Sequence, residues 1–221
     1  ISESENQMDL KIIYEDEQLL VCHKPAGVAT QTKRLGQQDM ESLLKNYRAS
    51  QGEPSYIGVV HRLDQPVEGV MVFTKTKEAA SDLSRQVQMK EADKFYYAVT
   101  DGVPVEKTGI LEDYLLRDGR TNTSKVVKEG TAGAKKARLS YEVLAEDGTH
   151  AILKIQLDTG RHHQIRVQLS HAGYPIVGDR KYNVDVVNSS GGGLKLCSYK
   201  IGFTHPKTHK KMEFEIENPY E

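Results

Sequence analysis

Short runs and alternations of apolar residues predict that most of this chain forms β-strands. Residues 10–24 contain two strand-forming runs, too short for helices, on either side of Glu15-Asp16-Glu17. The apolar stretch GVMVFTKT at 69–76 predicts a buried strand. Further strands are expected near residues 94–100, 109–116, 137–144, 149–157, 194–204 and 211–216, separated mostly by turns that contain Gly or Asp.

Helical spacing is found in three places. Residues 40–47 and 77–90 each place their apolar side chains on one face. Residues 161–172 lie between Gly- and Pro-containing turns and favour a third helix, in which His162 and Arg166 would share a face, although Ile165, Val167 and Leu169 also fit a strand. Consecutive strands with few helices predict the α+β class, with a mainly antiparallel mixed sheet flanked by helices and loops.

Composition is that of a globular protein. The chain has 221 residues, of which 38% are hydrophobic and 28% charged, with no repeat and no linker that would divide it, so one domain is expected. No apolar run is long enough to span a membrane. Cys22 and Cys197 lack the spacing of a disulfide framework or a CxxC site, which indicates a reducing, cytoplasmic location.

The formal net charge of −1 hides an uneven distribution. Residues 117–138 contain seven basic residues against Asp118 and Glu129. This basic stretch could face an anionic partner, or it could be the solvated surface of a hairpin.

Three segments contain candidate chemistry. The first is VVHRLDQP at 59–66, where Asp64 follows an apolar strand. A carboxylate held there beside an arginine can act as a nucleophile or general base, or it can simply cap the turn before Pro66.

The second segment is TGRHHQIR at 159–166. Its basic side chains could bind phosphates or pair with a carboxylate. His162 and His163 could also bind zinc together with His171, as in a metallohydrolase, but no HExxH motif or paired-ligand spacing accompanies them.

The third segment is KFYYAV at 94–99. In a strand, Phe95 and Tyr97 point to one face and Tyr96 to the other. Tyr96 could therefore stack on a nucleobase, or it could be an ordinary half-buried tyrosine.

Taken together and in this order, these segments resemble the RluA-type pseudouridine synthases. The resemblance covers residues 10–217. It rests on the Lys24-Pro25-x-Gly27 turn, His-Arg-Leu-Asp at 61–64, Lys94-x-Tyr96-x-Ala98, the Gly-Arg-x-His-Gln-Ile-Arg pattern at 160–166, Pro175, Gly178-Asp179 and Phe203-x-His205-Pro206.

The resemblance implies isomerisation of specific uridines in rRNA or tRNA to pseudouridine, without a cofactor or metal. Asp64 would supply the carboxylate, either attacking C1′ or removing the C2′ proton. Arg166 would pair with Asp64, and Tyr96 would stack on the uracil and help to remove the C5 proton. Arg62 would enter the space left by the flipped base, and His61 would support the loop.

Further RNA contacts are expected from His61, Arg161, His163 and Gln164, and from lysines of the basic stretch. Those lysines are Lys125, Lys128, Lys135 and Lys136.

The chain departs from the family pattern at two positions. Val67-Glu68-Gly69 replaces the common Thr-Ser-Gly, and Leu196-Cys197-Ser198 replaces Leu-His-Ala. If the first change displaced Asp64, the protein would be an RNA-binding protein of the same fold with impaired catalysis. We expect a poorly ordered extension at 1–9 and a monomeric catalytic domain at 10–221, without the N-terminal RNA-binding module of many relatives.

Overall fold

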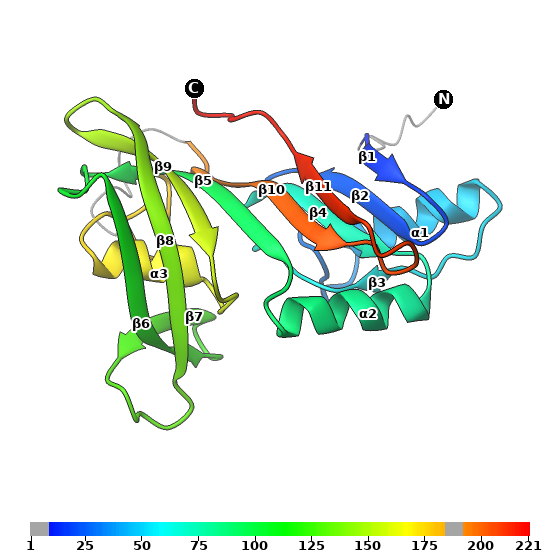
Figure 1. Ribbon diagram of the computed structural model, residues 1–221, viewed down its shortest axis with the longest axis horizontal. Coiled ribbons are helices and arrows are strands. Elements are labelled where there is room, and N and C mark those ends of the chain that lie inside the picture. The colour runs from blue at the N-terminus through cyan, green and yellow to red at the C-terminus, as the bar shows by residue number, and fades with distance from the viewer. Residues whose placement is uncertain (1–8, 184–191) are drawn as a thin grey trace.

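In the computed structural model, the described residues are 9–183 and 192–221, so most of the extension predicted at 1–9 lies outside them. Eleven strands of the described residues form one mixed sheet, and three helices pack on it. Figure 1 shows the sheet as two halves that meet at β10 (Leu196–Thr204). The α+β class with a mainly antiparallel sheet is thereby confirmed.

The half that holds the N-terminal strands is covered on both faces. Its strands are β1 (Lys11–Glu15), β2 (Leu19–Lys24), β3 (Gly58–Val59), β4 (Glu68–Thr74) and β11 (Lys211–Glu215). Leu20 packs with α1 (Met40–Ser50), whereas Leu19 packs with α2 (Lys77–Gln88). Successive strand residues point to opposite faces, so β2 and β4 contain continuous apolar runs at Leu19–Cys22 and Val70–Phe73.

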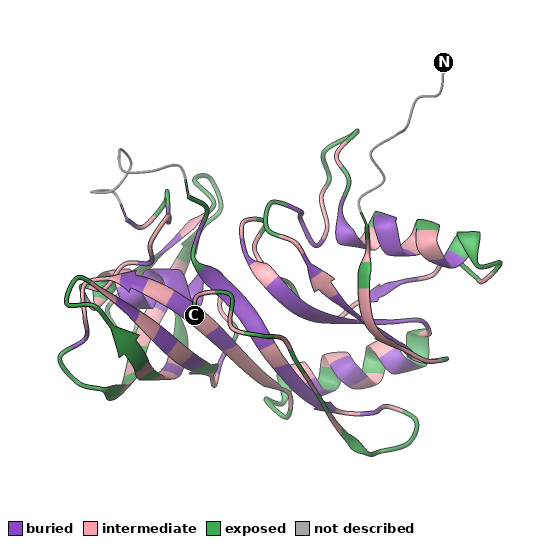
Figure 2. Ribbon diagram, turned by 90° about the horizontal axis from the view of Figure 1, so that it is seen from above, coloured by how far each residue is buried: buried purple, intermediate pink, exposed green. Residues whose placement is uncertain are grey.

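The other half is antiparallel and has one helix. It contains β5 (Asp93–Asp101), β6 (Thr108–Asp118), β7 (Thr123–Val127), β8 (Lys135–Glu146), β9 (His150–Leu157) and α3 (Gln164–His171). Ile165 and Leu169 of α3 pack against the core residues of β8 and β9. Figure 2 shows buried and more exposed residues alternating along these strands, as expected for strands with only one covered face.

The two halves are joined where β10 pairs in parallel with β4 and antiparallel with β5. Gly69 of β4 lies directly beside Ser198 of β10 and has a φ of +141°. A Cβ on Gly69 would come within 2.2 Å of the Ser198 carbonyl oxygen, so a larger residue would separate the strands.

Two predictions of local structure needed correction. The third helix begins at Gln164 rather than 161, because His163 has a left-handed backbone with φ of +53° and interrupts the turn. His162 therefore lies before α3 and does not share a helix face with Arg166. Strand β7 was not predicted, since its five residues lie inside the basic stretch and have little apolar content.

Among the described residues, no helix has the length and apolar character needed to cross a membrane.

Candidate active site

The site is centred on Asp64, in the loop between β3 and β4. The loop is fixed by internal hydrogen bonds: Thr30 Oγ1 donates to the Leu63 carbonyl at 3.1 Å and accepts from the Leu63 amide at 3.2 Å. The Val67 amide donates to the Asp64 carbonyl at 2.9 Å. Asp64 thus has a rigid backbone although its side chain remains 30% exposed.

The side chain of Lys24 also holds the loop that contains Asp64. Its side chain is fully buried, and Nζ donates to the carbonyls of Gln65 (3.1 Å), Pro25 (3.2 Å) and Val28. Burial lowers the pKa of Lys24 to about 8, although the negative charges of Asp64 and Glu68 oppose this shift. The Lys-Pro-x-Gly turn is therefore part of the structure that positions Asp64.

One oxygen of Asp64 makes both of its side-chain contacts. Oδ2 accepts a hydrogen bond from Arg166 Nη1 at 3.2 Å and lies 3.6 Å from His163 Nε2. His163 directly precedes α3 and Arg166 lies in its first turn, about a hundred residues further along the chain. The predicted pairing of Asp64 with Arg166 is present in the structure.

Arg166 is held more tightly by a second carboxylate. Its Nε and Nη2 each donate at 2.8 Å to the two oxygens of Asp179, whose side chain has no exposed surface. Burial would lower the pKa of Arg166, but the hydrogen bonds and charge of Asp179, with a contribution from Asp64, raise it overall. The guanidinium is therefore a fixed cation between two carboxylates.

His163 is linked to Tyr182. Its Nδ1 lies 2.6 Å from Tyr182 Oη, which also accepts from the Ser124 amide of β7 at 2.8 Å. The Tyr182 ring also lies beneath the Arg166 guanidinium, 5.2 Å from the ring centre. Burial lowers the pKa of His163, so its imidazole is neutral at neutral pH. These contacts connect the β6–β7 hairpin to the active site.

Tyr96 lies on β5, opposite Ser198 in the sheet, and is 7% exposed. Burial raises the pKa of its phenol, and the nearby negative charge of Asp64 raises it further. The ring therefore offers a protonated, largely apolar surface close to the carboxylate.

The two basic residues that precede Asp64 have different environments. The exposed Arg62 donates to the side chain of Gln31 at 2.8 Å and to its carbonyl at 3.2 Å. His61 instead points to the sheet, where its Nε2 accepts from the Val72 amide at 3.0 Å. Burial, with the positive charge of Lys94, lowers the pKa of His61 to about 4. This placement fits the expected support of the loop rather than contact with RNA.

Gln164 and Arg161 also differ from one another. Gln164 is 3% exposed, and its side chain bonds with Thr159 Oγ1 (2.7 Å), the Arg161 amide (3.0 Å) and the Arg138 carbonyl (3.1 Å). Because the interior uses its donors and acceptors, Gln164 is placed as a structural residue. Arg161 is only half-buried, and its Nε donates to the Lys136 carbonyl at 2.8 Å.

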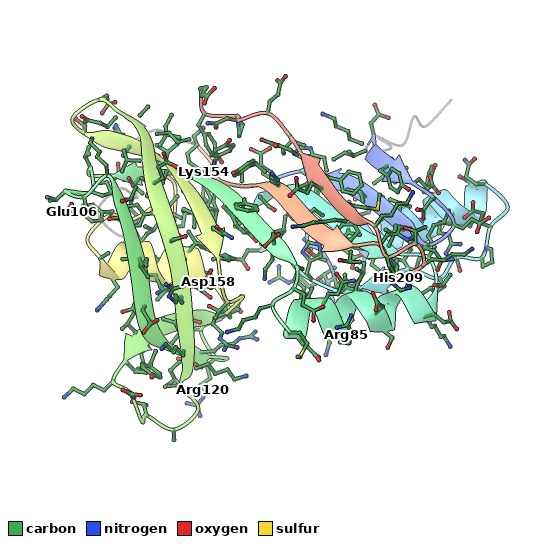
Figure 3. All side chains as sticks on the ribbon, viewed as in Figure 1. Arg85, Glu106, Arg120, Lys154, Asp158 and His209 are labelled. Atoms are coloured by element: carbon green, nitrogen blue, oxygen red, sulfur yellow. The ribbon has the colours of Figure 1, made fainter. Side chains whose placement is uncertain are left out.

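The predicted lysines lie on or next to the β6–β7–β8 strands. Lys125, Lys128, Lys135 and Lys136 are all exposed. Lys136 differs in having a carboxylate partner, Glu112, at 2.9 Å. Figure 3 shows Arg120, from the turn between β6 and β7, at the end of this hairpin remote from Glu106.

The structure does not gather the three histidines of the metal alternative. His162 and His163 stack with ring centres 3.7 Å apart, and the His162 nitrogens face Ser124 Oγ (2.8 Å) and Asn122 Oδ1 (3.1 Å). Over residues 9–183 and 192–221, no group of three His, Cys, Asp or Glu side chains is arranged to hold a metal ion.

Three residues of this site were not identified from the sequence: Lys24, Asp179 and Tyr182. Lys24 and Asp179 belong to the motifs that carried the family resemblance, so their positions could have been singled out, but nothing in their spacing revealed what they contact. Tyr182 gave no signal, because its role depends on the approach of β7 to the segment before α3.

The sequence of the chain is similar to those of known proteins. A family model described as RNA pseudouridylate synthase matches residues 18–171. Ribosomal large subunit pseudouridine synthase D of Neisseria meningitidis serogroup B is 33% identical over 225 residues, covering 96% of this chain and 59% of that protein. An uncharacterized RNA pseudouridine synthase of Aquifex aeolicus is 34% identical, covering 95% of this chain and 70% of that protein. The chain thus spans less than two thirds of the Neisseria relative.

Two solved structures share the fold. Human RNA pseudouridylate synthase domain containing 1 superposes with a TM-score of 0.80 at 22% identity, covering 100% of this chain and 88% of that one. Human RNA pseudouridylate synthase domain containing 4 has a TM-score of 0.78 at 22% identity, covering 95% and 89%.

Proposed function

Because the chain belongs to the RNA pseudouridylate synthase family, we propose that it isomerises uridine to pseudouridine within RNA, with Asp64 as the essential residue. The observation that carries the proposal is the state of the Asp64 carboxylate. Oδ2 is held by Arg166, whereas Oδ1 has no hydrogen-bond partner among the described residues. A carboxylate oxygen without a partner, on a rigid loop, is available for chemistry.

The reaction requires the glycosidic bond from C1′ to N1 to break, the uracil to turn, and C5 to bond to C1′. In one route Asp64 Oδ1 attacks C1′ and is displaced when C5 rejoins. In the other it removes the C2′ proton as the C1′–N1 bond breaks and returns it to C2′ when C5 bonds to C1′. Both routes need a carboxylate at the sugar, and the fixed cation of Arg166 lies beside this one. In both, the C5 proton is finally lost and N1 gains a proton, so no outside oxidant or reductant is consumed.

Tyr96 and Arg62 have proposed roles beside the carboxylate. The protonated ring of Tyr96 would stack on the uracil after the nucleotide leaves its helix. Arg62 has no carboxylate partner within the described ranges, and its exposed side chain could extend into the RNA where the base had been. His163 would help to orient Asp64 as a neutral neighbour.

We infer that the target uridine lies in rRNA or tRNA, and the name of the Neisseria relative supports RNA of the large ribosomal subunit. The expected cytoplasmic location and monomeric state remain predictions from the sequence.

Mapping pseudouridine across ribosomal and transfer RNA tests the proposal. RNA from cells that lack the protein should acquire pseudouridine at one or a few positions when treated with the purified chain. The Asp64→Asn variant is the matched control and should add none. RNA binding by the wild-type chain without any new pseudouridine would instead support the catalytically impaired RNA-binding protein.

A further inference from the structure

Cations in and next to the Asp64 site differ in whether they have partners. Arg166 has two carboxylate partners, Lys24 is bonded to three carbonyls, and Arg138 pairs with Asp158 and Glu112. Lys94 and Arg161 differ, since no carboxylate in the described ranges lies within ion-pair distance of either. Two neighbouring cations without a counter-ion require another explanation.

Lys94 extends from the same face of β5 as Tyr96. The two residues are separated by two positions, or about 6.6 Å along a strand. The Lys94 ammonium lies against the backbone of Gly160, where a Cβ would come within 2.5 Å of Nζ. Because residue 160 is a glycine, there is room for the Lys94 ammonium at this point. The contact brings β5 against the segment that leads to His163.

Arg161 is next to this contact. Its Nε is used by the Lys136 carbonyl, which leaves the four N–H groups of the two terminal nitrogens without a partner in the described structure. Burial lowers the pKa of Lys94, and the positive charge of Arg161 lowers it further. The pair would consequently gain from an anion that neutralises both charges.

We propose that Lys94 and Arg161 bind a backbone phosphate of the substrate RNA next to the target uridine. The inference rests on the proposed function, because it takes RNA as the substrate. A phosphate suits the pair: the planar guanidinium can donate two parallel hydrogen bonds, and the ammonium adds a compact charge. A contact of this kind carries no sequence information but fixes register, which here places one nucleotide over Tyr96 and beside Asp64.

Phosphate-ethylation interference tests the proposal on RNA whose modified position has not been identified. Fragments of ribosomal RNA retained by the wild-type chain are partly ethylated at their phosphates, which removes the charge, and are selected again for binding. We expect the wild-type chain to reject ethylation at a small set of phosphates, one of them next to a uridine. Lys94→Met and Arg161→Gln should accept ethylation at that phosphate, still reject it at the others, and bind unmodified RNA about 10-fold more weakly.

The control is Lys154→Met. Lys154 lies on β9 opposite Tyr97 of β5, on the sheet face opposite to that of Lys94. The variant should therefore give the wild-type interference pattern. Because Arg161 is only half-buried, Arg161→Gln should fold and so allows a test even if Lys94→Met does not fold. An unchanged interference pattern in folded Arg161→Gln would overturn the proposal. Pseudouridine formation is scored separately on the same RNA, so its absence with the expected pattern would refute the activity and not the phosphate site.

Discussion

At the level of single residues, the geometry of Asp64 depends on a chain of charged contacts. Asp179 is buried and holds Arg166 by two 2.8 Å bonds, and Arg166 reaches Asp64 by a longer bond of 3.2 Å. The buried Asp179–Arg166 pair therefore fixes the position and orientation of the guanidinium that contacts Asp64. Asp179 is accordingly a positioning residue.

Replacing Asp179 by Asn should loosen Arg166 without touching the substrate. We expect kcat to fall on the order of 10- to 100-fold with little change in KM, because small displacements of catalytic groups cost this much. Combining Asp179→Asn with Arg166→Lys should be little worse than Arg166→Lys alone, since residues that act as a unit are not additive. Steady-state kinetics on folded variants checks this, and multiplying losses would contradict the arrangement.

The residues that could be predicted were those with a recognisable motif and a chemical reason to be there. Asp64 and Arg166 are far apart in sequence, yet the family resemblance correctly paired them. The same motifs contained Asp179 and Lys24, but sequence gives no contact distances, so their partners could not be assigned. Gln164 was expected to face RNA, and only the packing of its amide against Thr159 and Arg138 revealed an interior role.

At the level of elements, the β6–β7 hairpin is both a basic surface and a neighbour of the proposed catalytic residues. The Ser124 amide bonds to Tyr182, and the Lys181 ammonium bonds to the Asn122 carbonyl at 2.7 Å. RNA held by this hairpin would therefore lie next to the site.

Replacing Lys125, Lys128 and Lys135 by Gln should weaken RNA binding and its dependence on salt. We expect the slope of log affinity against log salt to fall by about 0.7 to 0.9 for each lost phosphate contact. Turnover at saturating RNA should stay close to the wild-type value. Lys136→Gln should have a smaller effect because Glu112 already pairs with Lys136.

The control is Lys210→Gln, an exposed lysine of the turn between β10 and β11. Lys210 is exposed, and its neighbour His209 lies in Figure 3 in the other half of the molecule from Arg120. Titrations at several salt concentrations distinguish the outcomes. An unchanged slope in the triple variant would show that the basic stretch is only a solvated surface.

Elements whose apolar residues have a clear helical or strand period were predicted well. Elements whose bounds depend on contacts with other segments were not. The spacing of α1 and α2 is helical, and both begin where Asp39 and Thr76 cap the first turn. The start of α3 could not be predicted, because the left-handed turn at His163 depends on its contacts with Asp64 and Tyr182 rather than on local preference.

Across the whole molecule, one of the two ladders that join the halves of the sheet is short: β4 pairs in parallel with β10 at Glu68 and Gly69. Further along β4, His61 Nε2 accepts a hydrogen bond from the Val72 amide. This bond requires an unprotonated Nε2. The folded protein therefore favours neutral His61, whose pKa is lowered from 6.5 to about 4.

The sign of the resulting pH effect follows from linkage. His61 contributes stability that is fully present above about pH 6.5 and is lost as the pH falls toward 4. We expect the free energy of unfolding of the wild-type chain to drop over this range by up to about 3 kcal/mol more than that of His61→Gln. Denaturant titrations at a series of pH values measure the difference. His171→Gln, at an exposed site on α3, should follow the wild type, and parallel curves for His61→Gln would refute the assignment.

The proposed chemistry makes breakage of the uridine C5–H bond in RNA depend on Asp64. Transcripts labelled with tritium at uridine C5 report this directly, because pseudouridine formation releases the label to water. The wild-type chain should release tritium from its target RNA, and Asp64→Asn should do so on the order of a thousand-fold more slowly while binding that RNA with similar affinity. Release by Asp64→Asn at a rate near that of the wild type would contradict the catalytic role of this carboxylate.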